Sequence, residues 1–97
     1  MVLEIAEMYV RASEQPAFEE AIERALRTIA EMTKGFKSYH LHKGIESPER
    51  YVMQVWWESK EDHTGIAAPA REIWRSIVAP FFSQPAKVEH FTLVTAS

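Results

Sequence analysis

The sequence has 97 residues, 46% of them apolar and 26% charged, which is typical of a single globular domain covering residues 1–97. A formal net charge of −3 and the lack of a basic stripe argue against binding to nucleic acid. The absence of cysteine excludes disulfides, thiolate catalysis and cysteine metal sites. No apolar run approaches the roughly 20 residues of a membrane span. We therefore expect a cytoplasmic protein that does not contact a membrane.

The first part of the chain predicts a strand, a helix and a second strand. Residues 2–11 form the first strand, and each of its faces combines apolar side chains with one glutamate, Glu4 on one face and Glu7 on the other. The helix begins at Pro16, ends near residue 32 before Gly35, and has apolar side chains at helical spacing. Residues 36–43 form the second strand.

The second part of the chain predicts a strand, a broken helix and a final strand. Residues 50–57 are apolar on both faces, which is typical of a central strand covered on both sides. Ser59 is placed to cap a short helix over residues 60–66. A second helix over residues 69–78 has an inner stripe of Ala70, Ile73, Trp74 and Ile77, and residues 88–94 form the closing strand.

The resulting order, βαββαβ, is that of an α+β, ferredoxin-like domain. In this plan a four-stranded antiparallel sheet has helices on one face. The apolar character of both faces of the central strand indicates that the opposite face is also covered. We expect a second copy of the chain there, so that the protein is a homodimer.

Several motifs, taken in order, resemble the antibiotic biosynthesis monooxygenase (ABM) domain family over about residues 2–94. They are Gly35-Phe36 at the start of the second strand, Trp57-Glu58-Ser59 at the end of the third, and His63 in the following helix. The resemblance implies a ferredoxin-like unit that pairs into a dimeric α/β barrel. It also implies a cofactor-independent monooxygenase that oxidises a small aromatic or quinone-like compound with molecular oxygen, without metal or flavin.

The known catalytic residues of the family are not kept. In haem-degrading members, an asparagine, a tryptophan and a histidine occupy the positions of Tyr9, Ile66 and Ser76, so haem degradation is not expected. Polyketide-oxidising members rely on an asparagine at the position of Met53. The resemblance therefore predicts the fold, but it does not identify the catalytic residues of this chain.

Five residues are the candidates for a substrate site. His63 and Glu7 are the candidate bases, because an imidazole or a carboxylate with a raised pKa can deprotonate a phenol. Tyr9, Trp57 and Trp74 are expected to form the walls of the pocket. Glu7 and Tyr9 are expected at the pocket because the resemblance implies that their face of the first strand points toward the helices. Each of the five also has a structural interpretation, as a core residue, a backbone hydrogen-bond partner or an open edge position.

Two further groups of residues have weaker interpretations. His40 and His42 form an H-x-H pair that, with His90 on another strand, is conceivable as a metal site, but no carboxylate pattern supports it and no metal is expected. Arg71 and Arg75, four residues apart on the last helix, either bind an acidic group of a substrate or lie on a solvated face.

The sequence leaves open whether the protein is an enzyme. The alternative is a non-catalytic dimeric barrel that binds a small hydrophobic ligand in a regulatory or stress role, and an isomerase or lyase would use the same pocket and base. An open pocket with a desolvated base favours an oxygenase, whereas a pocket filled by aromatic side chains favours the alternative.

Overall fold

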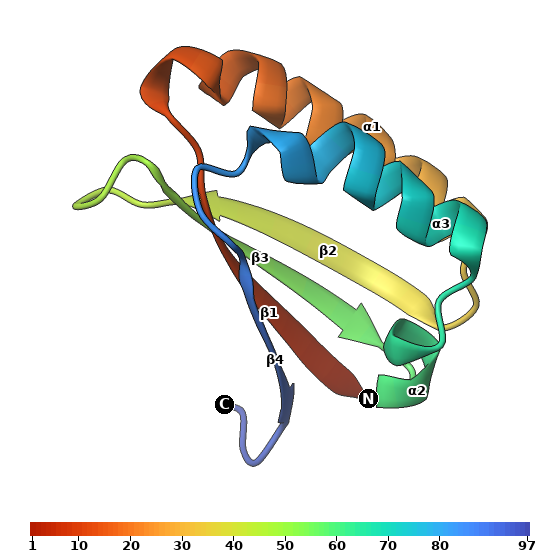
Figure 1. The fold of residues 1–97 in the computed structure, drawn as a ribbon. Coiled ribbons are helices and arrows are strands. Elements are labelled where there is room, and N and C mark those ends of the chain that lie inside the picture. Colours follow the sequence, from red (N-terminus) through yellow and green to blue (C-terminus); the bar gives the residue numbers. More distant parts are fainter.

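The computed structural model describes residues Met1 to Ser97 as one sheet with helices packed against a single face (Figure 1). The strands are β1 (Val2–Tyr9), β2 (Phe36–Lys43), β3 (Arg50–Trp57) and β4 (Lys87–Thr92), and the helices are α1 (Gln15–Glu31), α2 (Lys60–Thr64) and α3 (Ala68–Ile73). All neighbouring strands are antiparallel, in the order β2-β3-β1-β4. The expected ferredoxin-like α+β fold is confirmed.

The core lies between the sheet and α1. Alternate residues of β1 and β3 point toward the helices, as expected for strands with a side-chain period of two. The predicted apolar stripe of α1 is fully buried against them. The buried apolar side chains of these three elements are Ala6, Met8, Phe18, Ile22, Ala25, Leu26, Ile29, Tyr51, Met53, Val55 and Trp57.

Two local signals in the sequence fix the ends of the elements that flank the later site. Gly35 follows α1 with a φ of +82°, a left-handed conformation that favours glycine. A Cβ atom at this position would lie 2.2 Å from Oδ2 of Asp62. At the start of α2, the Ser59 hydroxyl accepts a hydrogen bond of 3.2 Å from the backbone N–H of Asp62, as predicted for an N-cap.

The last helical region differs from the prediction in its inner stripe. α3 continues into a π-helical turn, Trp74–Val78, and a 3₁₀ turn, Ala79–Phe81. Val78 is fully buried, whereas Ile77, which was expected to face inward, is 45% exposed. A π-helical turn closes its hydrogen bonds over one more residue than an α-helical turn, so the buried position moves one residue along the chain.

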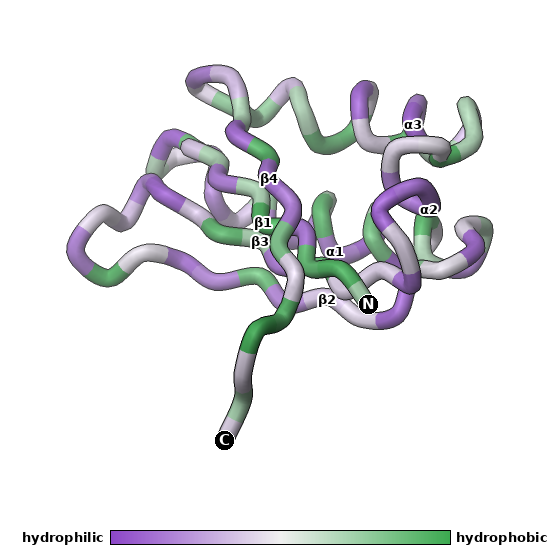
Figure 2. The backbone as a smooth tube through the Cα atoms, turned by 90° about the horizontal axis from the view of Figure 1, so that it is seen from below, coloured by the Kyte–Doolittle hydropathy of each residue, from purple (hydrophilic) through white to green (hydrophobic).

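The other face of the sheet carries no helix (Figure 1). The half-buried side chains of Leu3, Ile5, Val52 and Trp56 lie on this face. After β4 the chain runs away from the body of the molecule, with Leu93 and Val94 exposed (Figure 2). No helix combines the length and the apolar character needed to cross a membrane.

Candidate functional site

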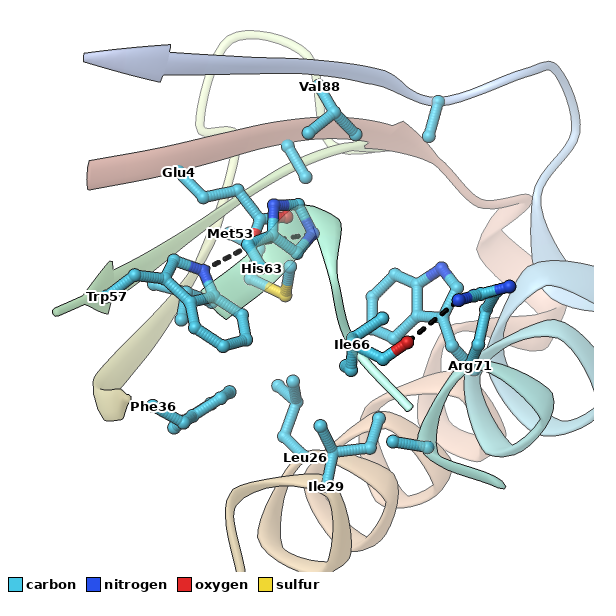
Figure 3. A pocket seen from close by; sticks show the side chains of 15 residues that line it. Glu4, Leu26, Ile29, Phe36, Met53, Trp57, His63, Ile66, Arg71 and Val88 are labelled. Atoms are coloured by element: carbon cyan, nitrogen blue, oxygen red, sulfur yellow. Dashed lines mark hydrogen bonds and ion pairs between the residues drawn. The ribbon is translucent and has the colours of Figure 1, made fainter. Parts of the chain in front are cut away.

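A cavity of about 150 Å³ lies between the sheet and the helices (Figure 3). Twelve of the fifteen residues that line it are hydrophobic, and the other three are Glu4, His63 and Arg71. The walls therefore suit an apolar molecule, and the three polar side chains are the groups that can orient it or exchange protons with it.

Glu4 is the buried carboxylate of this cavity. The alternation of β1 turns its side chain toward the helices, and only 4% of the residue is exposed. The indole Nε1 of Trp57 donates a hydrogen bond of 2.9 Å to Oε1 of Glu4. Burial raises the pKa of Glu4 above its ordinary value, and the hydrogen bond from Trp57 offsets part of this rise.

His63 connects this carboxylate to a second histidine. Its Nε2 lies 3.5 Å from Oε1 of Glu4, and its Nδ1 lies 2.7 Å from Nε2 of His90. The imidazole also stacks on the indole of Trp57, with ring centroids 5.0 Å apart and an angle of 21° between the planes. In the antiparallel register β4 places His90 directly beside Glu4 of β1. Four side chains from four different elements thus form one cluster, which we call the Glu4–Trp57–His63–His90 cluster.

Burial lowers the pKa of both histidines, and for His90 the neighbouring His63 lowers it further. Near neutral pH both rings are therefore neutral, and one imidazole donates its N–H to the unprotonated nitrogen of the other. Oε1 of Glu4 is occupied by Trp57, whereas Oε2 accepts no hydrogen bond from the protein. The cluster can accept a proton from a molecule in the cavity and pass it from His63 to half-buried His90.

The structure brings three of the five predicted site residues to the cavity, since Trp57, His63 and Trp74 all line it. Glu7 and Tyr9 do not, and the expectation that their face of β1 meets the helices is wrong. Glu7 Oε2 lies 2.5 Å from the guanidinium of Arg50 on the opposite face, and the Tyr9 hydroxyl donates to Glu7 at 3.3 Å. Arg50 lowers the pKa of Glu7, which makes Glu7 a weaker base.

The sequence pattern does not identify Glu4, and it indicates His90 only as a conceivable metal ligand. The signal that could have identified Glu4 is the indole of Trp57, because a buried tryptophan N–H requires an acceptor. The histidines do not converge as a metal site, because His40 and His42 stack on each other and are exposed on β2, on the opposite face of the sheet. No three His, Asp or Glu side chains are arranged to hold a metal ion.

Comparison with known proteins agrees with this architecture. The family model described as "Antibiotic biosynthesis monooxygenase" (ABM) matches residues 1–66. Protein YczJ of Bacillus subtilis (strain 168), which is uncharacterised, is 32% identical over 93 residues, covering 94% of this chain and 97% of YczJ. A crystal structure from Bordetella bronchiseptica with the same family description has a TM-score of 0.86 and 30% identity, and covers 97% of each chain.

A structure that contains a bound ligand is also similar. The monooxygenase from the gene ActVA-Orf6 of Streptomyces coelicolor, solved in complex with nanaomycin D, has a TM-score of 0.83. The match covers 99% of this chain and 89% of that protein at 18% identity, so it supports the shared fold alone.

Proposed function

This chain belongs to the antibiotic biosynthesis monooxygenase family, and we propose that it oxidises a small aromatic or quinone-like compound with molecular oxygen. In this proposal the substrate itself supplies the electrons, and no metal or flavin takes part. The proposal rests chiefly on one observation, the buried Glu4 carboxylate and His63 imidazole at an otherwise apolar cavity. This is the open pocket with a desolvated base that an oxygenase of this kind requires.

The reaction follows from the chemistry of an acidic phenol. Glu4, with His63 beside it, removes a proton from a substrate in which a phenol activates a CH₂ group, and forms a delocalised anion. The anion transfers one electron to O₂, and the resulting radical and superoxide combine to form a C–O bond. The peroxide takes back the first proton from the base. Loss of the second C–H proton then breaks the O–O bond, so that CH₂ and O₂ become C=O and water.

The apolar walls explain how such an anion could be formed selectively. The lining residues offer the proton few acceptors other than Glu4 and His63. Half-buried Trp74 offers an aromatic face on which a planar ring can stack, whereas the indole of Trp57 is buried and already stacks on His63. An engineered protein cavity of about 150 Å³ is known to bind benzene, so we expect one ring to be enclosed and any larger part of the substrate to extend outward.

We further propose that the protein is a homodimer in which the sheet faces without helices pack together. An antiparallel sheet can leave one face in water when that face is polar. Here Leu3, Ile5, Val52 and Trp56 give the face an apolar centre, and the family resemblance implies a dimeric barrel. The charged pair of Glu7 and Arg50 lies on the same face.

One observation favours the alternative function of a non-catalytic ligand-binding barrel. Met53 lines the cavity where polyketide-oxidising members have an asparagine, so no side-chain amide is available there to orient a hydroxyl or peroxide. A barrel that only binds a hydrophobic ligand would need no such group.

The test is oxygen uptake with a panel of anthrone- and hydroquinone-type compounds, with anaerobic reactions as controls. Hydroquinones would yield quinone and hydrogen peroxide, and anthrones would yield the ketone and water, so product analysis distinguishes oxidation from oxygen insertion. We expect saturable uptake by the wild-type protein and a loss of about 10²-fold or more in kcat for Glu4→Gln.

The matched control is Glu23→Gln, because Glu23 is an exposed carboxylate of α1 paired with Arg27. It should retain wild-type turnover. No uptake above the uncatalysed rate across the panel, in a protein that still binds the same compounds, would favour the ligand-binding alternative.

A further inference from the structure

We propose that Arg71 binds an acidic substituent of the substrate, so that the preferred compound is a small aromatic molecule carrying a carboxylate or a similar anion. The inference rests on the proposed function only in that it places the substrate in the same cavity. The inference specifies the class of compound, which the Glu4–Trp57–His63–His90 cluster alone does not.

Arg71 is the only arginine of the chain without a carboxylate partner. The chain has six arginines and an excess of acidic side chains. The other five arginines each form an ion pair with a glutamate: Arg11 with Glu14, Arg24 with Glu20, Arg27 with Glu23, Arg50 with Glu7, and Arg75 with Glu72. A cation that remains unpaired among so many carboxylates is available for an anion from outside the chain.

Arg71 lies at the cavity, where its unpaired positive charge can bind a ligand. It is the one cationic residue that lines the cavity, and Nη2 donates a hydrogen bond of 2.8 Å to the backbone carbonyl of Ile66. This bond anchors the guanidinium at the connection between α2 and α3. The remaining N–H groups can present the planar, two-pronged geometry that binds a carboxylate with two hydrogen bonds.

Arg71 is also separated from the other polar groups of the cavity. Figure 3 shows Arg71 beside Ile66 on the helix side, across the cavity from Glu4, His63 and Trp57. The walls between these polar groups are apolar. An aromatic ring held between them would place its acidic substituent at Arg71 and its hydroxyl near Glu4 and His63.

Arg71 could instead serve only to hold the α2–α3 connection through Ile66. The two roles differ in their effect on neutral ligands. If the role of Arg71 is structural, its substitution weakens the binding of charged and neutral compounds alike. If Arg71 recognises the anion, its substitution weakens the binding of the charged compounds only. Benzoate and benzamide have similar shapes but differ in charge. The same is true of naphthoate and naphthamide.

The experiment is calorimetric titration of the whole protein with these four probes, without oxygen turnover. The variants are Arg71→Gln and, as matched control, Arg75→Gln, which removes an exposed, ion-paired arginine one turn along the same helical region. We expect the wild-type protein to bind each carboxylate more tightly than its amide. Arg71→Gln should weaken carboxylate binding about tenfold or more, leave amide binding within about twofold, and reduce the salt dependence. Arg75→Gln should change neither.

Equal loss of both ligands in Arg71→Gln would overturn the proposal in favour of the structural role. Equal affinity of the wild-type protein for acid and amide, or binding of none of the probes, would overturn it as well. Because binding is measured without catalysis, these outcomes are independent of the oxygen-uptake test. A protein that binds carboxylates through Arg71 but consumes no oxygen would disprove only the oxygenase function.

Discussion

Trp57 Nε1 and Glu4 Oε1, 2.9 Å apart, are joined by a hydrogen bond that links the end of β3 to the start of β1. The two side chains come from positions 53 residues apart in the sequence, yet they lie on neighbouring antiparallel strands. The bond satisfies two buried polar groups at once, the indole N–H of Trp57 and one carboxylate oxygen of Glu4. It therefore supports both the stability of the sheet and the orientation of the proposed base.

The strength of this bond can be measured with a double-mutant cycle of Trp57→Phe and Glu4→Leu, since neither variant can form it. Each single variant leaves one buried group with an altered partner, and we expect a coupling free energy of about 1–3 kcal/mol from urea denaturation. Trp56→Phe serves as a control, because Trp56 faces the opposite side of the sheet. Additive effects of the two variants would show that the bond contributes nothing to stability.

Only one of the two glutamates of β1 should support turnover. Glu4→Gln is expected to lower kcat about 10²-fold or more, whereas Glu7→Gln should keep kcat within a few-fold, because Glu7 lies on the opposite face paired with Arg50. The kcat values should be compared at a protein concentration where sedimentation shows the same assembly state for all variants. The reverse order of activity would show that the cavity at Glu4 is not the site of reaction.

Acid should destabilise the protein through the two histidines. Burial lowers the pKa of His63 and His90 below the ordinary value of 6.5, so the folded state binds protons less readily than the unfolded state. Their contribution to stability is present above pH 6.5 and is lost as the pH falls through the lowered pKa values. The contribution of Glu4 to stability depends on pH in the opposite direction. Because its pKa is raised, this contribution is present at low pH and is lost as the pH rises.

The test is to compare wild type with His90→Gln in urea denaturation between about pH 5 and pH 8, where histidines titrate. The difference between the two proteins should change with pH, and His90→Gln should lose less stability in acid. Lys60 and Glu4, which also act on the pKa of His90, are present in both proteins. A pH-independent difference would mean that His90 has an unperturbed pKa.

Gly35→Ala should lower the free energy of unfolding by at least about 1–2 kcal/mol, the usual cost of a left-handed conformation for a residue with a Cβ. The added methyl group would also clash with the carboxylate of Asp62, 2.2 Å away. Comparing Gly35→Ala, alone and combined with Asp62→Ala, separates the two effects. The double variant should recover the part of the loss that comes from the carboxyl group of Asp62, whereas the Asp62 Cβ, 2.8 Å from the added methyl group, remains. No loss in the single variant would contradict the positive φ of Gly35.

The proposed dimer can be tested with Trp56→Glu, which places a charge in the apolar centre of the sheet face without helices. Sedimentation should show a shift from dimer to monomer at micromolar concentration. Ile45→Glu is the matched control, since Ile45 is an apolar loop residue that is 87% exposed. A wild-type protein that is already monomeric and folded under these conditions would refute the dimer.

Much of the fold could be predicted because its signals are local. The repeat of apolar residues from Phe18 to Ile29, the cap at Ser59 and the glycine after α1 each act over a few residues, and the structure confirms all three. The order of strands follows from the same signals, because the ferredoxin-like plan has few ways to connect them.

The buried face of β1 could not be predicted from the same kind of signal. Each face of this strand carries one glutamate among apolar side chains, so its pattern does not show which face is inside. The choice depends on a partner far along the chain: the inner glutamate is stabilised by Trp57, and the outer one by Arg50. Burying a carboxylate without a partner is costly, so the inner position of Glu4 depends on the hydrogen bond from Trp57.

The walls of the cavity come from both layers of the domain, with Glu4 and Trp57 on the sheet and Arg71 and Trp74 on the helices that cover it. Substitutions in the short helical cover can therefore alter which molecules are admitted, while the proposed base Glu4 stays in place on β1. In evolutionary terms, the substrate range of such a protein can drift independently of its chemistry. The same separation would let an engineer redesign α3 for a new compound and leave β1 untouched.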